Sequence, residues 1–304
     1  MKQLSLVVTC TDRKVATPDA ALYARNLPQG SVRERSIDWH QRIQSAITRG
    51  GSALPALTEL YRGDHWSRAR RLMSVAVSAG FEAQLWVASA GLGLQPVEPK
   101  TQPAPPYSAT FSIRHADSVG ASAAENTQWW SHLQARTGQG TLEELGRRGP
   151  VLMALSEVYA GAMEEELLAL GALGGEALLI GGVREIPGVH RVPSDAGLRA
   201  TLGGTLTSLN VRMAAMWLEH SRDGQLTSSV TCTAWAQWAA ATSRPERYER
   251  VAMSDDEVIA FIRRETAKEP ALSRTRLLRV LRADGRACEQ SRFANLYKRS
   301  MGER

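Results

Sequence analysis

Short, unbroken runs of apolar residues occur at four places along the chain, each ending at a polar or glycine-containing turn. Runs of this length, rich in aliphatic and β-branched side chains, are typical of strands that are buried on both faces of a sheet. We therefore predict four buried strands, at residues 4–10, 81–90, 151–156 and 176–182.

Elsewhere the apolar residues recur every three to four positions, which is the spacing of a helix with one buried face. We predict helices at about 37–48, at 55–79, around Trp129 and Trp130, at 163–170 and from near Asn210 to His220. The order strand, helix, strand at the start of the chain indicates a right-handed crossover. The fold class that we expect is α/β, with a mixed sheet core flanked by helices and a small C-terminal helical module.

Two proline-containing segments divide the chain. Residues 95–107 contain five prolines, so we expect an extended surface loop there. Residues 243–250, SRPERYER, are polar and interrupted by a proline, and we place a domain boundary in them. This organisation gives an α/β domain at 1–243 and a basic module at 251–304, whose capping residues and breaks predict three short helices.

Composition excludes several classes of protein. The chain is 43% hydrophobic and 22% charged, which is ordinary for a globular protein and excludes a disordered, collagenous or coiled-coil chain. The three cysteines, Cys10, Cys232 and Cys288, are too few and too far apart for a disulfide framework or a CxxC zinc site, so we predict a reducing, cytoplasmic setting. No stretch has the apolar length of a membrane span, and the N-terminal run lacks a cleavage site, so we predict neither membrane insertion nor export.

Familiar motifs for cofactors and metals are missing from the sequence. The six histidines form no HExxH pattern, and no GxGxxG, P-loop or GxSxG motif occurs. We therefore predict no catalytic metal and no cofactor.

Positive charge is concentrated near the C-terminus. Residues 274–299 contain eight basic and two acidic residues, so this segment accounts for the net charge of +6 of the whole chain. Arg276, Arg279 and Arg282 recur at helical spacing opposite a set of leucines, which favours a cationic face that binds nucleic-acid phosphates. A solvated helix face is the alternative.

Cys10 is the strongest candidate nucleophile in the sequence. It ends the first predicted strand, where open α/β sheets place their ligands, and Asp12, Arg13 and Lys14 follow it directly. Nearby cations favour the thiolate, which is the reactive form of cysteine. The alternative is that Cys10 is a small buried side chain with a packing role.

Two other segments combine small or aromatic residues with polar ones. Ser89 and Gly91 belong to SAGLG, a turn of small residues that would let a ligand approach the backbone closely. The alternative is that this segment only forms a tight connection. In YRGDHW, Tyr61 and Trp66 could flank a planar ring while Asp64 contacts its edge, although such aromatics are more often part of a core.

A crowded polar stretch follows the proline-rich loop. Hydroxyl, imidazole and carboxylate groups could here orient a polar heterocycle and move a proton, and ordinary turn chemistry is the alternative. The groups belong to Tyr107, Ser108, Ser112, His115 and Asp117.

Several of these segments, taken in order, resemble the YaaA-like family of DNA-associated proteins. The similar segments are LVVTCTDRK, LYRGDHWSRA, LWVASAGLGL, PPYSATFS and VPSDAGLRATLGGTLTSLNVRMA, which span about the first 220 residues. PPYSATFSIRH is also similar to the KPYxxSxxH-type motif of archaeosine synthase, with a proline where that motif has its lysine. Within the superfamily, the chain looks most like the members from bacterial clusters that place 7-deazaguanine bases in DNA.

This resemblance implies a reaction, a partner and a set of site residues. The implied partner is DNA that contains 7-cyano-7-deazaguanine. The implied reaction adds water to the nitrile of this base and gives the 7-amido group. The resemblance also allows contacts with other proteins of the modification pathway. Cys10 would be the nucleophile, and His115 or Asp12 would move the proton. The groups that would bind the base belong to Ser89, Gly91, Tyr107, Ser108, Ser112 and Asn210. Those that would hold the DNA belong to Arg13, Lys14, Arg276, Arg279 and Arg282.

Two alternatives remain open at this point. The broader family resemblance allows a non-catalytic DNA-binding or stress-response protein. A base-excising glycosylase, in which Asp12 or Asp117 would activate water, is the weaker alternative.

Overall fold

The computed structural model describes residues 2–98, 103–137, 139–221, 224–244 and 251–302. The chain divides into two compact units, Met1–Arg244 and Pro245–Arg304. Most of the predicted boundary segment, at 245–250, lies outside the described residues.

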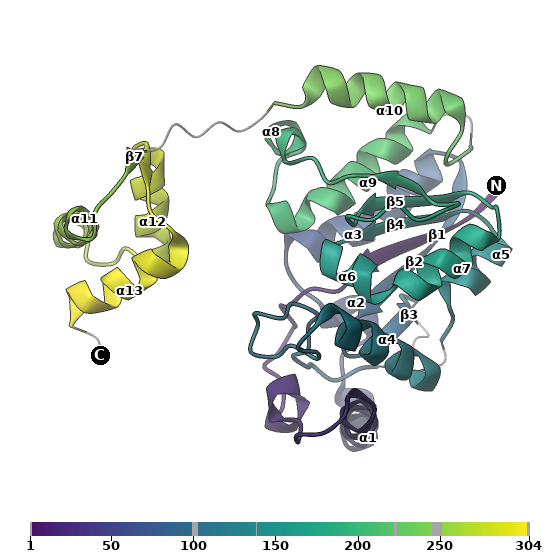
Figure 1. Ribbon diagram of the computed structural model, residues 1–304, viewed down its shortest axis with the longest axis horizontal. Coiled ribbons are helices and arrows are strands. Elements are labelled where there is room, and N and C mark those ends of the chain that lie inside the picture. The colour runs from purple at the N-terminus through teal and green to yellow at the C-terminus, as the bar shows by residue number, and fades with distance from the viewer. Residues whose placement is uncertain (1, 99–102, 138, 222–223, 245–250, 303–304) are drawn as a thin grey trace. The chain divides into compact units, whose positions relative to one another are not determined.

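A six-stranded mixed sheet forms the centre of the larger unit, in the order β3-β2-β1-β4-β5-β6 (Figure 1). All neighbouring strands are parallel except β2 and β3, which form an antiparallel hairpin. Helices flank the sheet, so the fold class is α/β as expected. The strands are β1 (Lys2–Thr9), β2 (Phe81–Ser89), β3 (Gly93–Pro96), β4 (Val151–Leu155), β5 (Ala177–Gly181) and β6 (His190–Val192).

All four strands predicted from apolar runs are present, because β1, β2, β4 and β5 occupy the buried positions of the sheet. The two strands of this sheet that the sequence did not indicate, β3 and β6, are short and lie at its edges. β3 also occupies the first residues of the predicted proline-rich loop, where Pro96 pairs with Trp86. An edge strand can accommodate proline because one side of its ladder is unpaired.

The predicted single helix at 55–79 is wrong. The structure has two helices there, α2 (Leu57–Leu60) and α3 (Asp64–Ser78), separated by Tyr61 in an extended conformation and by Gly63 at φ 103°. A φ in this range favours glycine. The break allows Tyr61 to pair with Lys14 in an antiparallel bridge, which brings the segment after β1 and the start of α3 together.

The other predicted helices of the larger unit are found, together with four described helices that were not predicted, α5, α6, α8 and α10. α1 (Val32–Gly50) begins earlier than expected because Ser31 and Glu34 form a capping box at its start. α4 (Ala123–Thr137) carries the two adjacent tryptophans. The remaining helices are α5 (Leu142–Arg148), α6 (Glu157–Ala162), α7 (Glu164–Ala172), α8 (Arg199–Leu202), α9 (Leu209–His220) and α10 (Ser229–Thr242).

The smaller unit contains the three helices predicted for the tail, α11 (Asp255–Lys268), α12 (Arg274–Ala283) and α13 (Gln290–Met301). A parallel pair of two-residue strands, β7 (Val251–Ala252) and β8 (Arg286–Ala287), joins its start to the α12–α13 connection. The unit has its own apolar core, made of side chains such as Val258, Leu277 and Phe293.

A candidate active site at the carboxyl ends of the strands

Polar side chains converge where three central strands end, and two of them, Cys10 and Ser89, were predicted from the sequence. Cys10 follows β1 directly, Ser89 is the last residue of β2, and Tyr159 lies on α6, which follows β4. The backbone N–H of Cys10 donates to the carbonyl of Ala88 at 2.9 Å, so β1 and β2 hold this residue in place. The carboxyl ends of strands are the usual ligand site of open α/β sheets.

Cys10 is partly exposed, and its thiol contacts a buried phenol. Its Sγ lies 3.1 Å from the Tyr159 hydroxyl, and the Tyr159 ring packs edge-on against Phe111 with centroids 4.9 Å apart. The thiol therefore has a hydrogen-bonding partner that is fixed by packing, and the residue as a whole is partly exposed. A nucleophile must be both positioned and accessible.

A chain of buried hydroxyls lies beside the thiol. Ser89 Oγ accepts hydrogen bonds from the backbone N–H groups of Gly91 at 3.1 Å and Leu92 at 3.0 Å. Both lone pairs of Ser89 are thereby used, so its own proton is directed to the Tyr107 hydroxyl, 2.5 Å away. The Tyr107 hydroxyl also lies 2.8 Å from the Tyr61 hydroxyl, within hydrogen-bonding distance. Ser89, Tyr107 and Tyr61 are therefore linked in one chain of buried hydroxyls.

The tyrosines of this site are strongly held in their neutral form. Burial raises the pKa of Tyr61, Tyr107 and Tyr159, and a negative charge on Cys10 would raise each pKa further. At neutral pH the three hydroxyls consequently keep their protons. Tyr159, whose hydroxyl lies next to Cys10 Sγ, can donate a hydrogen bond to a negative charge that develops there.

We call Cys10, Ser89, Tyr61, Tyr107 and Tyr159 the strand-end cluster, and Lys14 lies against its tyrosines. Its Nζ is 4.3 Å from the centroid of the Tyr107 ring and 5.8 Å from that of Tyr61, which are cation–π distances. Burial lowers the pKa of the Lys14 amine, while Cys10, Asp12 and Asp117 act in the opposite direction. The sequence predicted that Lys14 holds DNA, whereas in the structure its side chain lies over the rings of Tyr107 and Tyr61.

The polar stretch after the proline-rich loop divides into a buried part and an exposed part. Asp117 is 2% exposed and accepts hydrogen bonds from Ser108 Oγ at 2.7 Å and from the backbone N–H of Arg25 at 3.2 Å. Ser112 and His115 lie in an exposed turn, where His115 Nδ1 accepts the backbone N–H of Asp117 at 3.0 Å. Asp117 is thus buried and bonded to Ser108, whereas the His115 imidazole has its described contact within its own turn.

The remaining predicted residues lie around the rim. Asp12 and Arg13 are exposed beside Cys10. Asn210, at the start of α9, donates to the carbonyl of Leu155 at 2.8 Å and accepts from Ser194 Oγ at 2.6 Å. It therefore lies at the carboxyl end of β4, and its amide already bonds within the chain.

Two residues of the site were missed by sequence reasoning. Tyr159 lies three residues after Ser156, the last residue of a predicted strand. Its closeness to that strand end was the only sequence signal that could have identified it. His65 is buried, with Nε2 2.9 Å from the carbonyl of Thr9 and Nδ1 3.0 Å from that of Thr207. The His65 side chain therefore links Thr9, the residue before Cys10, to the turn at Thr207. Trp66, in contrast, is a core residue, whose indole donates to the carbonyl of Thr58.

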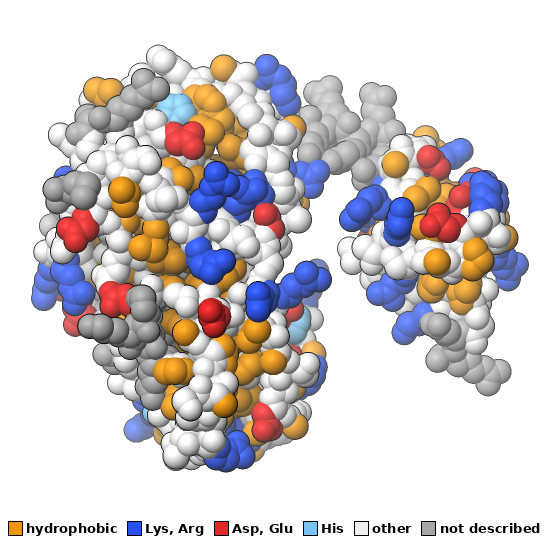
Figure 2. All heavy atoms as spheres, turned by 180° about the vertical axis from the view of Figure 1, so that it is seen from behind, with side chains coloured by type: hydrophobic (Ala, Val, Ile, Leu, Met, Phe, Trp, Pro, Cys, Tyr) orange, Lys and Arg blue, Asp and Glu red, His pale blue; other side chains and the backbone are white. Residues whose placement is uncertain are grey.

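The basic side chains of the smaller unit differ in their surroundings. Arg276 and Arg279 are exposed on α12, whereas Arg282 donates to the carbonyl of Cys288 at 3.1 Å and so also has a structural contact. Lysine and arginine side chains are spread over the visible surface of this unit (Figure 2). This distribution suits contacts with a polyanion.

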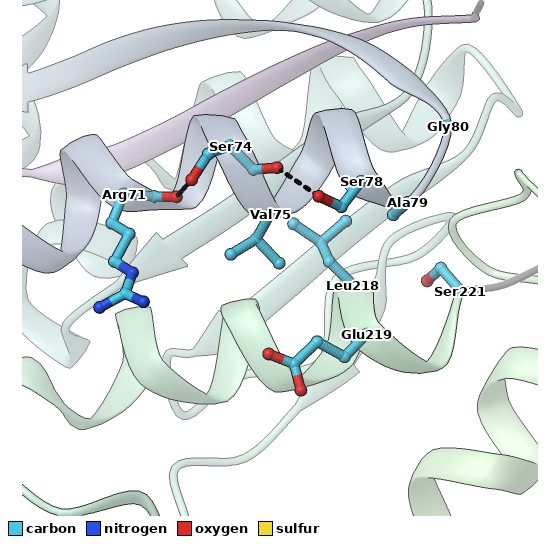
Figure 3. A pocket seen from close by; sticks show the side chains of 9 residues that line it. All are labelled: Arg71, Ser74, Val75, Ser78, Ala79, Gly80, Leu218, Glu219 and Ser221. Atoms are coloured by element: carbon cyan, nitrogen blue, oxygen red, sulfur yellow. Dashed lines mark hydrogen bonds between the residues drawn. The ribbon is translucent and has the colours of Figure 1, made fainter.

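A cavity of about 680 Å³ lies between the C-terminal halves of α3 and α9, away from Cys10 and its neighbours. Arg71 and Glu219 are among its lining residues, while the Ser74 and Ser78 hydroxyls bond back to their own helix (Figure 3). This hollow offers no nucleophile, so the chemistry is better placed at Cys10.

Searches for related proteins add no further information: no family model, curated protein or solved structure matches the chain significantly. Within the described ranges, no three His, Cys, Asp or Glu side chains are grouped closely enough to bind a metal ion. No helix in the same ranges has the length and apolar character required to cross a membrane. The fold and the cluster define an α/β protein with a strand-end cysteine site.

Proposed function

We propose that the protein hydrates the nitrile of 7-cyano-7-deazaguanine in DNA and produces the 7-amido base. The resemblance to the YaaA-like family, and within it to DpdC of the 7-deazaguanine modification clusters, suggests the substrate. The observation that carries the proposal is the position of Cys10, partly exposed and 3.1 Å from the Tyr159 hydroxyl, beside three tyrosines that remain protonated. The odd number of free cysteines favours a cytoplasmic setting.

The first step is attack of the Cys10 thiolate on the nitrile carbon. A bond forms between sulfur and carbon, one π bond of the nitrile breaks, and the nitrogen takes a proton, which gives a covalent thioimidate. Negative charge develops on the nitrogen during this attack. The Tyr159 hydroxyl lies next to Cys10 Sγ, where it can donate a hydrogen bond to that charge.

The second step releases the product by addition of water. Water adds to the thioimidate carbon, and one of its protons passes through a neighbouring base to the nitrogen, which becomes NH2. The resulting tetrahedral species expels the Cys10 thiolate as its C=O forms, and the remaining hydroxyl proton returns to the thiolate. The products are the amide and the regenerated enzyme, so the net change is the addition of one water to the nitrile. No oxidant or reductant is needed.

A base inside a duplex cannot reach a thiol surrounded by tyrosines. The proposed reaction therefore requires the modified base to leave the stack, or to be presented on a single strand. Exposed Arg13, near Cys10, would hold a flanking phosphate. Arg276 and Arg279, exposed on the smaller unit, would bind DNA phosphates independently.

The test is nucleoside mass spectrometry of DNA carrying 7-cyano-7-deazaguanine after incubation with wild type, Cys10→Ala and Cys232→Ala. We expect wild type and the Cys232→Ala control to add one water per modified base. Cys10→Ala should lose activity by at least about 10³-fold, because it lacks the nucleophile. Unchanged base mass with wild-type protein that binds this DNA would refute the proposed function. Hydration that survives Cys10→Ala would refute covalent catalysis.

A non-catalytic DNA-binding protein is the second candidate, and the exposed Arg276 and Arg279 favour it specifically. It predicts that Cys10→Ala retains all function, while loss of the two arginines removes it. DNA binding without any change in base mass would support this candidate.

A further inference from the structure

We propose that Ile113 is a wedge that enters the base stack of duplex DNA and fills the space left when the modified base turns out toward Cys10. This role rests on the proposed function, because it explains how the base of a duplex reaches the thiol, and it identifies duplex DNA as the substrate. Opening of the duplex can be measured whether or not the nitrile is hydrated.

The exposed turn at 112–116 is fixed at both ends beside the strand-end cluster. Phe111 precedes it, is fully buried, and packs edge-on against the Tyr159 ring with centroids 4.9 Å apart. Asp117 follows it, is 2% exposed, and accepts a hydrogen bond from Ser108 Oγ at 2.7 Å. The turn therefore projects into solvent from residues that contact or adjoin the cluster.

Hydrogen bonds hold this turn in one shape. The Thr110 N–H donates to the Asp117 carbonyl at 3.0 Å and closes the base of the turn. Within it, the His115 N–H donates to the Ser112 carbonyl at 2.9 Å, and His115 Nδ1 accepts the Asp117 N–H at 3.0 Å. A turn that is already ordered loses little conformational entropy when its tip binds a partner.

The tip of the turn combines an apolar side chain with a cation. Ile113 is 49% exposed, and the next residue, Arg114, is exposed as well. Isoleucine is among the side chains that proteins insert between base steps to unstack them. An arginine beside it can contact a flanking phosphate. This pair of side chains fits a duplex, which offers phosphates along its backbone and apolar surface where its stack opens.

Two other exposed apolar side chains near Cys10 are less well placed for this role. Val15 is 39% exposed, but its backbone N–H donates to the Leu60 carbonyl at 2.9 Å, which holds it against the neighbouring segment. Val158 is 40% exposed and lies within α6. Neither lies at the tip of a projecting turn, so Ile113 is the side chain that can enter a base stack.

The wedge acts on the equilibrium between the stacked and the extruded base. Extrusion breaks the pairing and stacking of the base, so the base returns unless something fills the space that it leaves. An inserted isoleucine occupies that space and raises the fraction of time that the base spends in the site. A single strand has no such space, so the wedge matters for duplex DNA alone.

The first test compares hydration of duplex and single-stranded DNA that carry 7-cyano-7-deazaguanine in the same sequence. Ile113→Ala should lower the rate on the duplex by at least about tenfold and leave the rate on the single strand within about twofold of wild type. Ile113→Leu retains an apolar side chain of the same size and should keep both rates. Val77→Ala, which truncates a 52%-exposed valine on α3, is the matched control. Equal losses on both DNAs, or an undiminished duplex rate in Ile113→Ala, would overturn the wedge.

Opening of the duplex is measured separately with pyrrolocytosine opposite the modified base, since its fluorescence rises when it loses its pairing partner. Saturating wild-type protein should raise this fluorescence, whereas Ile113→Ala should leave it near the level of the free duplex. If this difference is found and wild type leaves the base mass unchanged, the proposed hydration is wrong and the wedge stands. No rise with wild type, or hydration of the single strand only, would overturn the wedge.

Discussion

Gly91 lies where the hydroxyl chain leaves no room for a side chain. A Cβ at this position would lie 2.5 Å from both Cδ2 and Cε2 of Tyr107 and 3.1 Å from its Cζ. Ordinary contacts between carbon atoms are about 3.5–4.0 Å, so Gly91→Ala requires the ring to move by about 1 Å. The fully buried ring is held at its hydroxyl by Ser89 and Tyr61, and Trp39 packs edge-on against it.

The expected cost follows from these contacts. Overpacking costs about 1–3 kcal/mol, and weakening the two hydrogen bonds of Tyr107 costs roughly 1 kcal/mol each. The lower entropy of alanine in the unfolded chain offsets about 0.4–1 kcal/mol. We therefore expect Gly91→Ala to reduce the free energy of unfolding by about 2–4 kcal/mol, and Tm by about 5–15 °C for a unit of this size. Activity should fall as well, because Tyr107 belongs to the hydroxyl chain beside Cys10.

Urea denaturation followed by tryptophan fluorescence measures this loss, because all eight tryptophans lie in the larger unit. Gly161→Ala is the matched control, since a Cβ there has no atom within 4 Å and the residue is in α6. The control should be stabilised by about 0.5–1 kcal/mol. If Gly91→Ala unfolds within about 0.5 kcal/mol of wild type, the reasoning about Tyr107 is refuted.

Two further predictions concern pH and DNA. Burial lowers the pKa of His65 below its unfolded value of about 6.5, so its contribution to stability is present above pH 6.5 and is lost as pH falls through that value. His65→Gln should therefore lose less unfolding free energy than wild type between pH 7 and 5 in urea titrations, and identical pH profiles would contradict this. Arg276→Ala with Arg279→Ala should weaken DNA binding and reduce the slope of log affinity against log salt by about two. An unchanged salt slope in fluorescence anisotropy would show that these side chains do not contact phosphates.

The sequence by itself determined the α/β class, the four buried strands and the three helices of the smaller unit. Each depends on local information, either an apolar run of strand length or helical spacing with a capping residue, as at Ser254 and Ser273. It also placed Cys10 at a strand end, because the polar turn after the apolar run marks that end. The edge strands and the break at Tyr61 were not found, since short edge strands and a glycine with positive φ leave little trace in periodicity.

Only the tertiary structure decided which side chains meet Cys10. Tyr61, Tyr107 and Tyr159 come from three separate connections, and nothing in their sequence spacing relates them. The parallel register of β1 with β2 and β4 brings those connections to one edge of the sheet, and burial then fixes the hydroxyl chain and Lys14. Local sequence patterns indicate which face of a helix or strand is buried. Which side chains contact one another in the site depends on how distant elements pack, and the arrangement of the whole sheet determines this packing.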